Sequence, residues 1–260
     1  MINPSINSTE EENSTYTSQN KGASEKRDQF RVQMRREDRK DEIHKRRMPL
    51  MNTKKDNKDE EKWTHMSHLP DFLEQKKVIS GIYELEFDEK KLDELAKILL
   101  SNTDDFYQLH YSLIGIRKIL CLTENNPIQE VIDYNLPQKF IDFMSYEKYP
   151  HLILEATWCC CNISTGNSNQ IQRLIDKGLI PKLVKLLECN SMEIFEQASW
   201  CAANIAADCY EFKRLLINSG VVQPLVSKLI IATNMKQVGQ IVWSLSNVCR
   251  GKVPDLKIVQ

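Results

Sequence analysis

The apolar positions of this 260-residue chain follow a helical period from about residue 69 onward. Three stretches show the period clearly, each with apolar side chains on one side of a 3.6-residue wheel: 136–144, 179–187 and 221–230. Each stretch follows a residue that accepts the left-handed conformation in which one helix ends before the next begins: Asn135, Gly178 and Gly220. The pattern predicts an all-α domain over residues 69–260.

A sequence signature recurs within this domain at nearly constant intervals. Trp followed four residues later by Asn occurs as WCCCN, WCAAN and WSLSN, with Trp at positions 158, 200 and 243. The intervals are 42 and 43 residues, and the Asn or Gly positions are separated by 43 and 42. A period of about 40–47 residues made only of helices is typical of HEAT and armadillo repeats, which stack into superhelices with a concave face. We therefore predict an all-α, right-handed superhelical solenoid of about four repeats, the last of which ends the printed chain.

The last helix of each repeat has two different faces. In the second repeat Ala156, Cys160 and Ile163 share one side of the helix. Each residue turns the helix by about 100°, so Trp158, two positions after Ala156, points about 200° away from that side. We expect the small and branched residues to pack inside the solenoid and the Trp and Asn residues to be exposed on its other side. Burial of Trp and Asn between repeats is the alternative. The six residues are called the Trp–Asn ladder below: Trp158, Asn162, Trp200, Asn204, Trp243 and Asn247.

The residue types of the ladder favour an extended basic peptide as ligand. An Asn amide can hold both the N–H and the C=O of a peptide backbone. Indole faces attract the cation of Lys or Arg and cover its methylene stem, at about 0.5–2 kcal/mol each. Asp208, four residues after Asn204, adds a carboxylate for an ammonium or guanidinium group.

Charge is nearly balanced overall but unevenly distributed. Lys and Arg number 35 and Asp and Glu 36, yet the segment 25–47 holds ten basic and six acidic residues, a net charge of +4. This segment lacks Gly and Pro and has opposite charges at helical spacing, which favours a solvated helix. We expect a disordered tail at 1–24, a basic segment at 25–50, a flexible linker at 51–68 and the repeats at 69–260.

From about Asp93 to Lys252 the chain resembles the importin-alpha family of armadillo adaptors. The segments that carry the resemblance are IRKILCLTENNPIQEVID (116–133), EATWCCCNISTGNS (155–168), FEQASWCAANIAAD (195–208) and IVWSLSNVCRGK (241–252). MRREDRKDEIHKRR (34–47) is similar to the family's importin-beta-binding segment. The family continues for about six more repeats past the position of Arg250, with a second signal site and the surface for the nuclear export receptor.

The resemblance implies a nuclear import adaptor that uses no cofactor or metal and shuttles between cytoplasm and nucleus. Its partners are importin-beta, proteins with Lys/Arg-rich nuclear localisation signals and, indirectly, the nuclear pore machinery. The ladder, Gln197 and Asp208 match the family's signal-binding residues, whereas Asn167 stands where the family usually has a signal-contacting Thr. The importin-beta contacts fall on the basic segment: Arg31, Arg35, Arg36, Arg39, Lys40, Lys45, Arg46 and Arg47. Lys45–Arg47 are also expected to fill the chain's own signal site when importin-beta is absent.

Other functions remain open to different degrees. One alternative is a short decoy or regulatory armadillo protein that sequesters cargo or importin-beta. The same sequence features would be present in such a protein and in the product of an incomplete gene. Nucleic-acid binding is disfavoured because acidic residues interrupt the basic segment. No stretch reaches the ~18 apolar residues of a membrane span. No phosphate loop, catalytic motif or zinc spacing occurs, so we expect no enzyme, and we expect the eight cysteines to fill helix interfaces in reduced form.

Overall fold

The computed structural model describes residues 72–101, 103–122 and 126–250, and within them the secondary structure is helical throughout, with no strand. The first helices are α2 (Phe72–Glu84), the 3-10 helix η3 (Glu89–Lys91), α3 (Leu92–Leu100) and α4 (Phe106–Ile119). The next three are α5 (Ile128–Asp133), α6 (Leu136–Phe143) and α7 (Pro150–Ile163), followed by α8 (Ser168–Asp176), α9 (Leu179–Leu187) and α10 (Met192–Ala206). The last are α11 (Tyr210–Asn218), α12 (Val222–Ile231) and α13 (Met235–Cys249). The all-α prediction is confirmed for these residues, whereas the expected tail, basic segment and linker before residue 69 lie outside them.

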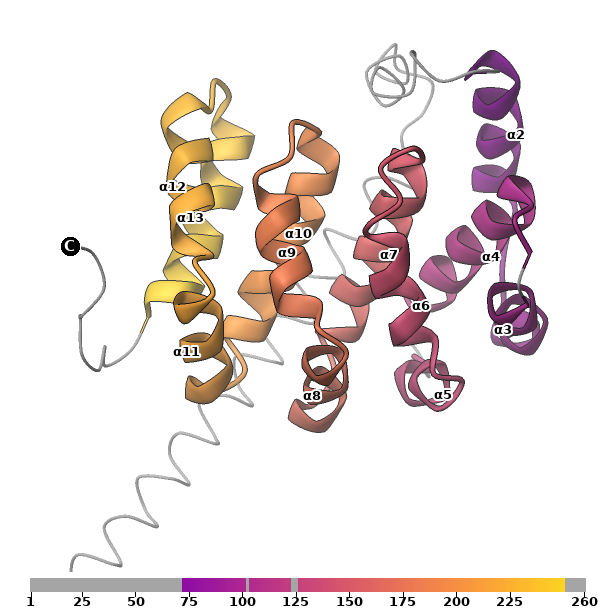
Figure 1. Ribbon diagram of the computed structural model, residues 1–260, viewed down its shortest axis with the longest axis horizontal. Coiled ribbons are helices and arrows are strands. Elements are labelled where there is room, and N and C mark those ends of the chain that lie inside the picture. Colours follow the sequence, from indigo (N-terminus) through magenta and orange to yellow (C-terminus); the bar gives the residue numbers. More distant parts are fainter. Residues whose placement is uncertain (1–71, 102, 123–125, 251–260) are drawn as a thin grey trace, which may run out of the picture. The chain divides into compact units, whose positions relative to one another are not determined.

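The helices form repeating units of three. A short helix (α5, α8 or α11) leads to a second helix (α6, α9 or α12), which packs on a longer third one (α7, α10 or α13). Figure 1 shows the third helices side by side, and α4 contacts α7, α7 contacts α10, and α10 contacts α13 in the same way. This stack is the solenoid that the 42- and 43-residue intervals predict.

Left-handed residues separate the first and second helices of each unit. Asn135, Gly178 and Gly220 have φ of 57°, 83° and 87°, as the sequence predicts. A side chain strains this conformation because its Cβ approaches the following carbonyl, which is why Gly or Asn occupies the position. The turn redirects the chain so that the second helix can pack against the third.

The inward face of the third helices is made of small and branched residues, as predicted. Ala156, Cys160 and Ile163 are fully buried, and so are their counterparts in α10, Ala198, Ala202 and Ile205. All eight cysteines are free thiols. Those of α7, together with Cys201, are buried in the interfaces between helices, whereas Cys249 is exposed, contrary to the expected interface position.

Side-chain hydrogen bonds tie each repeat to its neighbour. The Lys228 ammonium donates to the Cys189 carbonyl at 2.7 Å, and the Gln240 amide donates to the Glu196 carbonyl at 3.1 Å. Such bonds between repeats, from α4 to α13, join residues separated by 37 to 46 positions in the sequence. Each repeat is therefore held by its sequence neighbours in the stack.

The last helix of the described stack packs through the same face as the earlier third helices. Ile241 and Val248 are buried, and Leu245 is partly buried against the core. Their side of α13 faces α10 and α12, because helical residues at i, i+4 and i+7 share one inward face. The large apolar side chains that are exposed in the last unit are Tyr210, Leu215, Ile230, Ile231, Met235 and Val242.

Among the described helices, none alone is both long and apolar enough to cross a membrane. α11 and α12 reach the length and apolar composition of a membrane span only when they are taken together, and the two helices are bent by 71° relative to each other.

Candidate functional site

The three rungs of the Trp–Asn ladder occupy equivalent turns of α7, α10 and α13. Local sequence fixes where these helices begin: Pro150 stands in the first turn of α7, and Ser191 and Asn234 cap α10 and α13 by accepting hydrogen bonds from Ile194 N–H and Gln237 N–H. Because the helices begin at equivalent places and stack directly, each repeat contributes one Trp and one Asn to a continuous row.

The first Trp of the row is buried, which corrects the expectation of an exposed ladder. Trp158 is only 6% exposed. The Arg117 guanidinium of α4 lies over its ring, with Cζ 4.4 Å from the ring centroid, well within cation–π range. The wheel identified the correct face of α7 but could not show that the preceding repeat places a long side chain on it.

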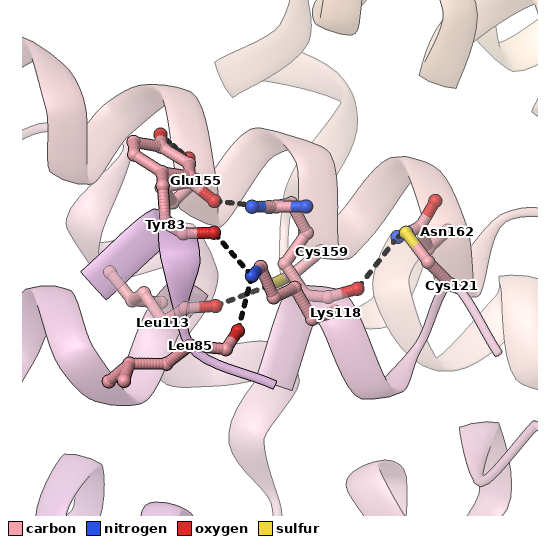
Figure 2. A network of polar contacts seen from close by, with 9 residues as sticks. Tyr83, Leu85, Leu113, Lys118, Cys121, Glu155, Cys159 and Asn162 are labelled. Atoms are coloured by element: carbon pink, nitrogen blue, oxygen red, sulfur yellow. Dashed lines mark hydrogen bonds and ion pairs between the residues drawn. The ribbon is translucent and has the colours of Figure 1, made fainter. Parts of the chain in front are cut away.

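The Asn residues of the first two rungs are also buried, at 2% exposure for Asn162 and 3% for Asn204. Asn162 Nδ2 donates to the Arg117 carbonyl at 3.4 Å and to Cys121 Sγ at 3.3 Å (Figure 2). Asn204 Nδ2 donates to Ser164 Oγ at 3.2 Å. A buried amide is stabilised when it is hydrogen-bonded, and the end of the preceding third helix supplies the acceptors. The amides thus join repeats, a role that the single-helix wheel did not predict.

The later rungs are more open and carry unpaired polar atoms. Trp200, Trp243 and Asn247 are half-buried. Trp200 Nε1, Asn247 Nδ2 and Gln197 Oε1 are buried atoms without a hydrogen-bond partner among the described residues. An unpaired buried polar atom costs about 1–3 kcal/mol, so a ligand group that paired with any of these atoms would recover part of that free energy.

Two carboxylates accompany the middle rung. Asp208 lies two residues past the end of α10, as expected, and is buried. Glu196 was missed by the sequence reasoning, although it lies four residues before Trp200 and therefore on the same face of α10. Burial raises the pKa of the Glu196 carboxyl, and Lys236 partly opposes this. A cationic ligand near Glu196 would lower that pKa again.

Asn167, which departs from the family's Thr, has a structural role. Its side chain accepts a hydrogen bond from Gln170 N–H at 3.0 Å, and the Gln170 side chain accepts one from Asn167 N–H at 3.0 Å. This reciprocal capping box begins α8. Asn167 itself is exposed.

A polar network joins α2, α4 and α7 next to the first rung (Figure 2). Glu155 of α7 accepts from Arg117 Nε at 2.5 Å and from the Tyr83 hydroxyl of α2. The neighbouring Lys118 ammonium donates to the carbonyls of Tyr83 and Leu85 at 2.6 and 2.5 Å. Burial lowers the pKa of Lys118, and Arg117 lowers it further. Sequence spacing gave no signal for these contacts, because Tyr83 and Glu155 lie 72 residues apart.

The remaining predicted site residues lie outside the described residues. They are the eight importin-beta-binding positions: Arg31, Arg35, Arg36, Arg39, Lys40, Lys45, Arg46 and Arg47. In the part of the chain that the structure describes, no group of three His, Cys, Asp or Glu side chains could hold a metal ion.

Comparisons with known proteins agree with this architecture. Residues 167–207 match the Armadillo/beta-catenin-like repeat. Importin subunit alpha-1a of Oryza sativa subsp. japonica is 35% identical over 166 residues, which are 63% of this chain and 31% of the relative. Importin subunit alpha-4 of Arabidopsis thaliana is 41% identical over 167 residues, 64% of this chain and 31% of the relative.

The repeats are similar to those of importin-alpha subunits. The chain spans about a third of the length of these importin-alpha relatives. Among solved structures, a designed armadillo repeat protein in complex with the peptide (KR)4 is similar, with a TM-score of 0.56, 25% identity and coverage of 80% of this chain and 82% of that one.

Proposed function

We propose that this chain is a nuclear import adaptor. In this proposal the Trp–Asn ladder binds Lys/Arg-rich nuclear localisation signals, and the basic segment 25–50 binds importin-beta. The observation that carries the proposal is the likeness of the repeats to importin-alpha subunits and to an armadillo protein in complex with a Lys/Arg peptide. An adaptor of this kind is present in both cytoplasm and nucleus.

The described residues support the ligand chemistry. Trp200 Nε1 can donate to a peptide carbonyl, Gln197 Oε1 can accept from a peptide N–H, and Asn247 Nδ2 can donate to a second carbonyl. The Glu196 and Asp208 carboxylates lie on or just after the same helix and suit the cationic side chains of the signal. The peptide backbone would satisfy the buried polar atoms while its basic side chains lie between indoles.

Peptide binding to the full chain tests the groove. A fluorescent Lys/Arg-rich peptide should bind, and Trp200→Ala should weaken binding by at least about tenfold, since it removes an indole and a donor. Asn247→Ala, at a half-buried position, should weaken it by about three- to tenfold through loss of one hydrogen bond. Tyr146→Ala removes an exposed aromatic ring outside the ladder and is the matched control. Absence of peptide binding, or equal loss in the control, would refute the proposal.

The basic segment has its own test. Importin-beta should be captured by the full chain and not by a chain without residues 1–50. If Lys45, Arg46 and Arg47 compete for the ladder, the same deletion should raise the affinity for the signal peptide. Unchanged peptide affinity after deletion would contradict this competition, and undiminished capture of importin-beta would contradict the assignment of the segment.

A further inference from the structure

The first indole of the ladder already has a cation on it, supplied by the chain itself. Arg117 is 3% exposed, and its guanidinium lies 4.4 Å from the Trp158 ring centroid and 5.7 Å from that of Tyr83. The residue belongs to α4, one repeat before Trp158, so it covers the side of the indole that faces the beginning of the stack.

The position of this cation is fixed by a buried partner. Glu155, on the same helix as Trp158, accepts from Arg117 Nε at 2.5 Å and also binds the Tyr83 hydroxyl. Although burial alone would lower the pKa of Arg117, the charge of Glu155 raises it, so the guanidinium stays protonated. A planar guanidinium held by a carboxylate and stacked on an indole is far less mobile than a lysine on the surface.

The next rung has no equivalent of Arg117. Cys159 precedes Trp200 by 41 residues, as Arg117 precedes Trp158, and it is a buried, uncharged thiol bonded to the Leu113 carbonyl. Among the described residues no Lys or Arg lies over the Trp200 ring. The internal cation is therefore present at the first rung and not at the second, and the repeated pattern is broken between them.

We propose that Arg117 ends the row of cation slots. Basic side chains of a ligand are bound from the space between Trp158 and Trp200 onward, and the far side of Trp158 contributes no further slot because Arg117 fills it. A peptide that extends past Trp158 gains nothing from a basic residue there. Arg117 is thus a specificity-determining residue that sets how many consecutive basic residues are read. This inference rests on the proposed function.

The dependence of affinity on peptide length tests the inference. The full chain is titrated with (KR)2 and (KR)4, and the double variant Arg117→Ala/Glu155→Gln is compared with it. The variant opens the slot, leaves no unpaired buried carboxylate, and keeps a side chain that can bond Tyr83. The control Lys185→Ala/Glu147→Gln removes an exposed ion pair of 2.8 Å and the same two charges.

We expect (KR)2 to bind the double variant and the wild-type protein equally, which also shows that the variant is folded. (KR)4 should bind the variant about three- to tenfold more tightly than the wild-type protein, since one slot is added. The control should keep the wild-type ratio. The inference is overturned if the two proteins show the same ratio of (KR)4 to (KR)2 affinity.

Two further outcomes are distinguishable. If the double variant binds neither peptide, Arg117→Gln/Glu155→Gln, which can keep a hydrogen bond between the two side chains, is measured with the same expectation. Arg117→Lys keeps the cation and should keep the wild-type ratio, so a gain for (KR)4 in this variant would also overturn the inference. A wild-type protein that binds no (KR)4 would remove the proposed function itself.

Discussion

His110 should make the stability of the repeats depend on pH. The residue is completely buried in α4, its Nδ1 bonds the Phe106 carbonyl at 3.0 Å, and its ring lies 4.0 Å from that of Phe106 and 6.0 Å from that of His151. Its Nε2 has no hydrogen-bond partner among the described residues. Burial lowers the pKa of His110 from 6.5 to about 4, because this environment solvates the imidazolium poorly.

The direction and the size of this pH effect on stability follow from proton linkage. Above a pH of about 6.5 the ring is neutral in both states, so its contribution is fully present; below that pH the unfolded chain binds a proton that the folded chain does not. Stability is therefore lost as the pH falls from 6.5 toward about 4 and changes no further below that. Between about pH 7 and pH 5 the loss amounts to about 2 kcal/mol.

Urea unfolding of the wild-type protein and of His110→Asn, followed by circular dichroism at both pH values, measures this loss. Asn places an amide where Nδ1 was and cannot be protonated in this range, so the difference between the two proteins isolates the histidine. His110→Asn should lose about 2 kcal/mol less than the wild-type protein on acidification. Equal losses in the two proteins would refute the argument that His110 is held neutral by burial.

Three further predictions concern packing and access. Gly178→Ala should lower the free energy of unfolding, measured with urea, by about 1–2 kcal/mol, because Gly178 has a φ of +83°. Gly239→Ala, in the interior of α13, should instead raise the free energy of unfolding. Equal effects of the two substitutions would contradict the role of the left-handed turn. Arg117→Leu should lower the free energy of unfolding of the repeats by about 3–5 kcal/mol, because it leaves Glu155 as an unpaired buried charge. The double variant Arg117→Leu/Glu155→Leu should recover much of this loss in the same unfolding assay. Iodoacetamide should modify the exposed Cys249 first and the buried cysteines of α7 only on unfolding, and peptide mass mapping showing uniform modification would be inconsistent with the packing.

Helix positions and turns were predictable because they depend on local sequence. The expected helix 179–187 is α9 to the residue. The stretch 136–144 differs from α6 by one residue at one end, and 221–230 differs from α12 by one residue at each end. The three left-handed residues follow from the same local chemistry, since only Gly and a few polar residues accept positive φ readily.

The environment of the ladder was only half predictable. A helical wheel separates two faces. Ala156, Cys160 and Ile163 lie in the core as it predicted, whereas the exposure that it predicted for Trp158 and Asn162 is wrong. The burial of Trp158 and Asn162 arises from Arg117 and Cys121, which lie about one repeat earlier and reach across the helix interface. Comparing residues at one-repeat offsets would have shown that Arg117 breaks the pattern, whereas nothing local links Glu155 to Tyr83.

The hydrogen bonds that join one repeat to the next also bear on how fast such a chain folds. They connect residues 37 to 46 positions apart, a distance set by the repeat length. Folding slows as contacts join more distant parts of a sequence, because longer loops must be closed first. In this architecture every added repeat brings contacts of the same separation, so the chain can grow without lengthening the loop that any single contact has to close.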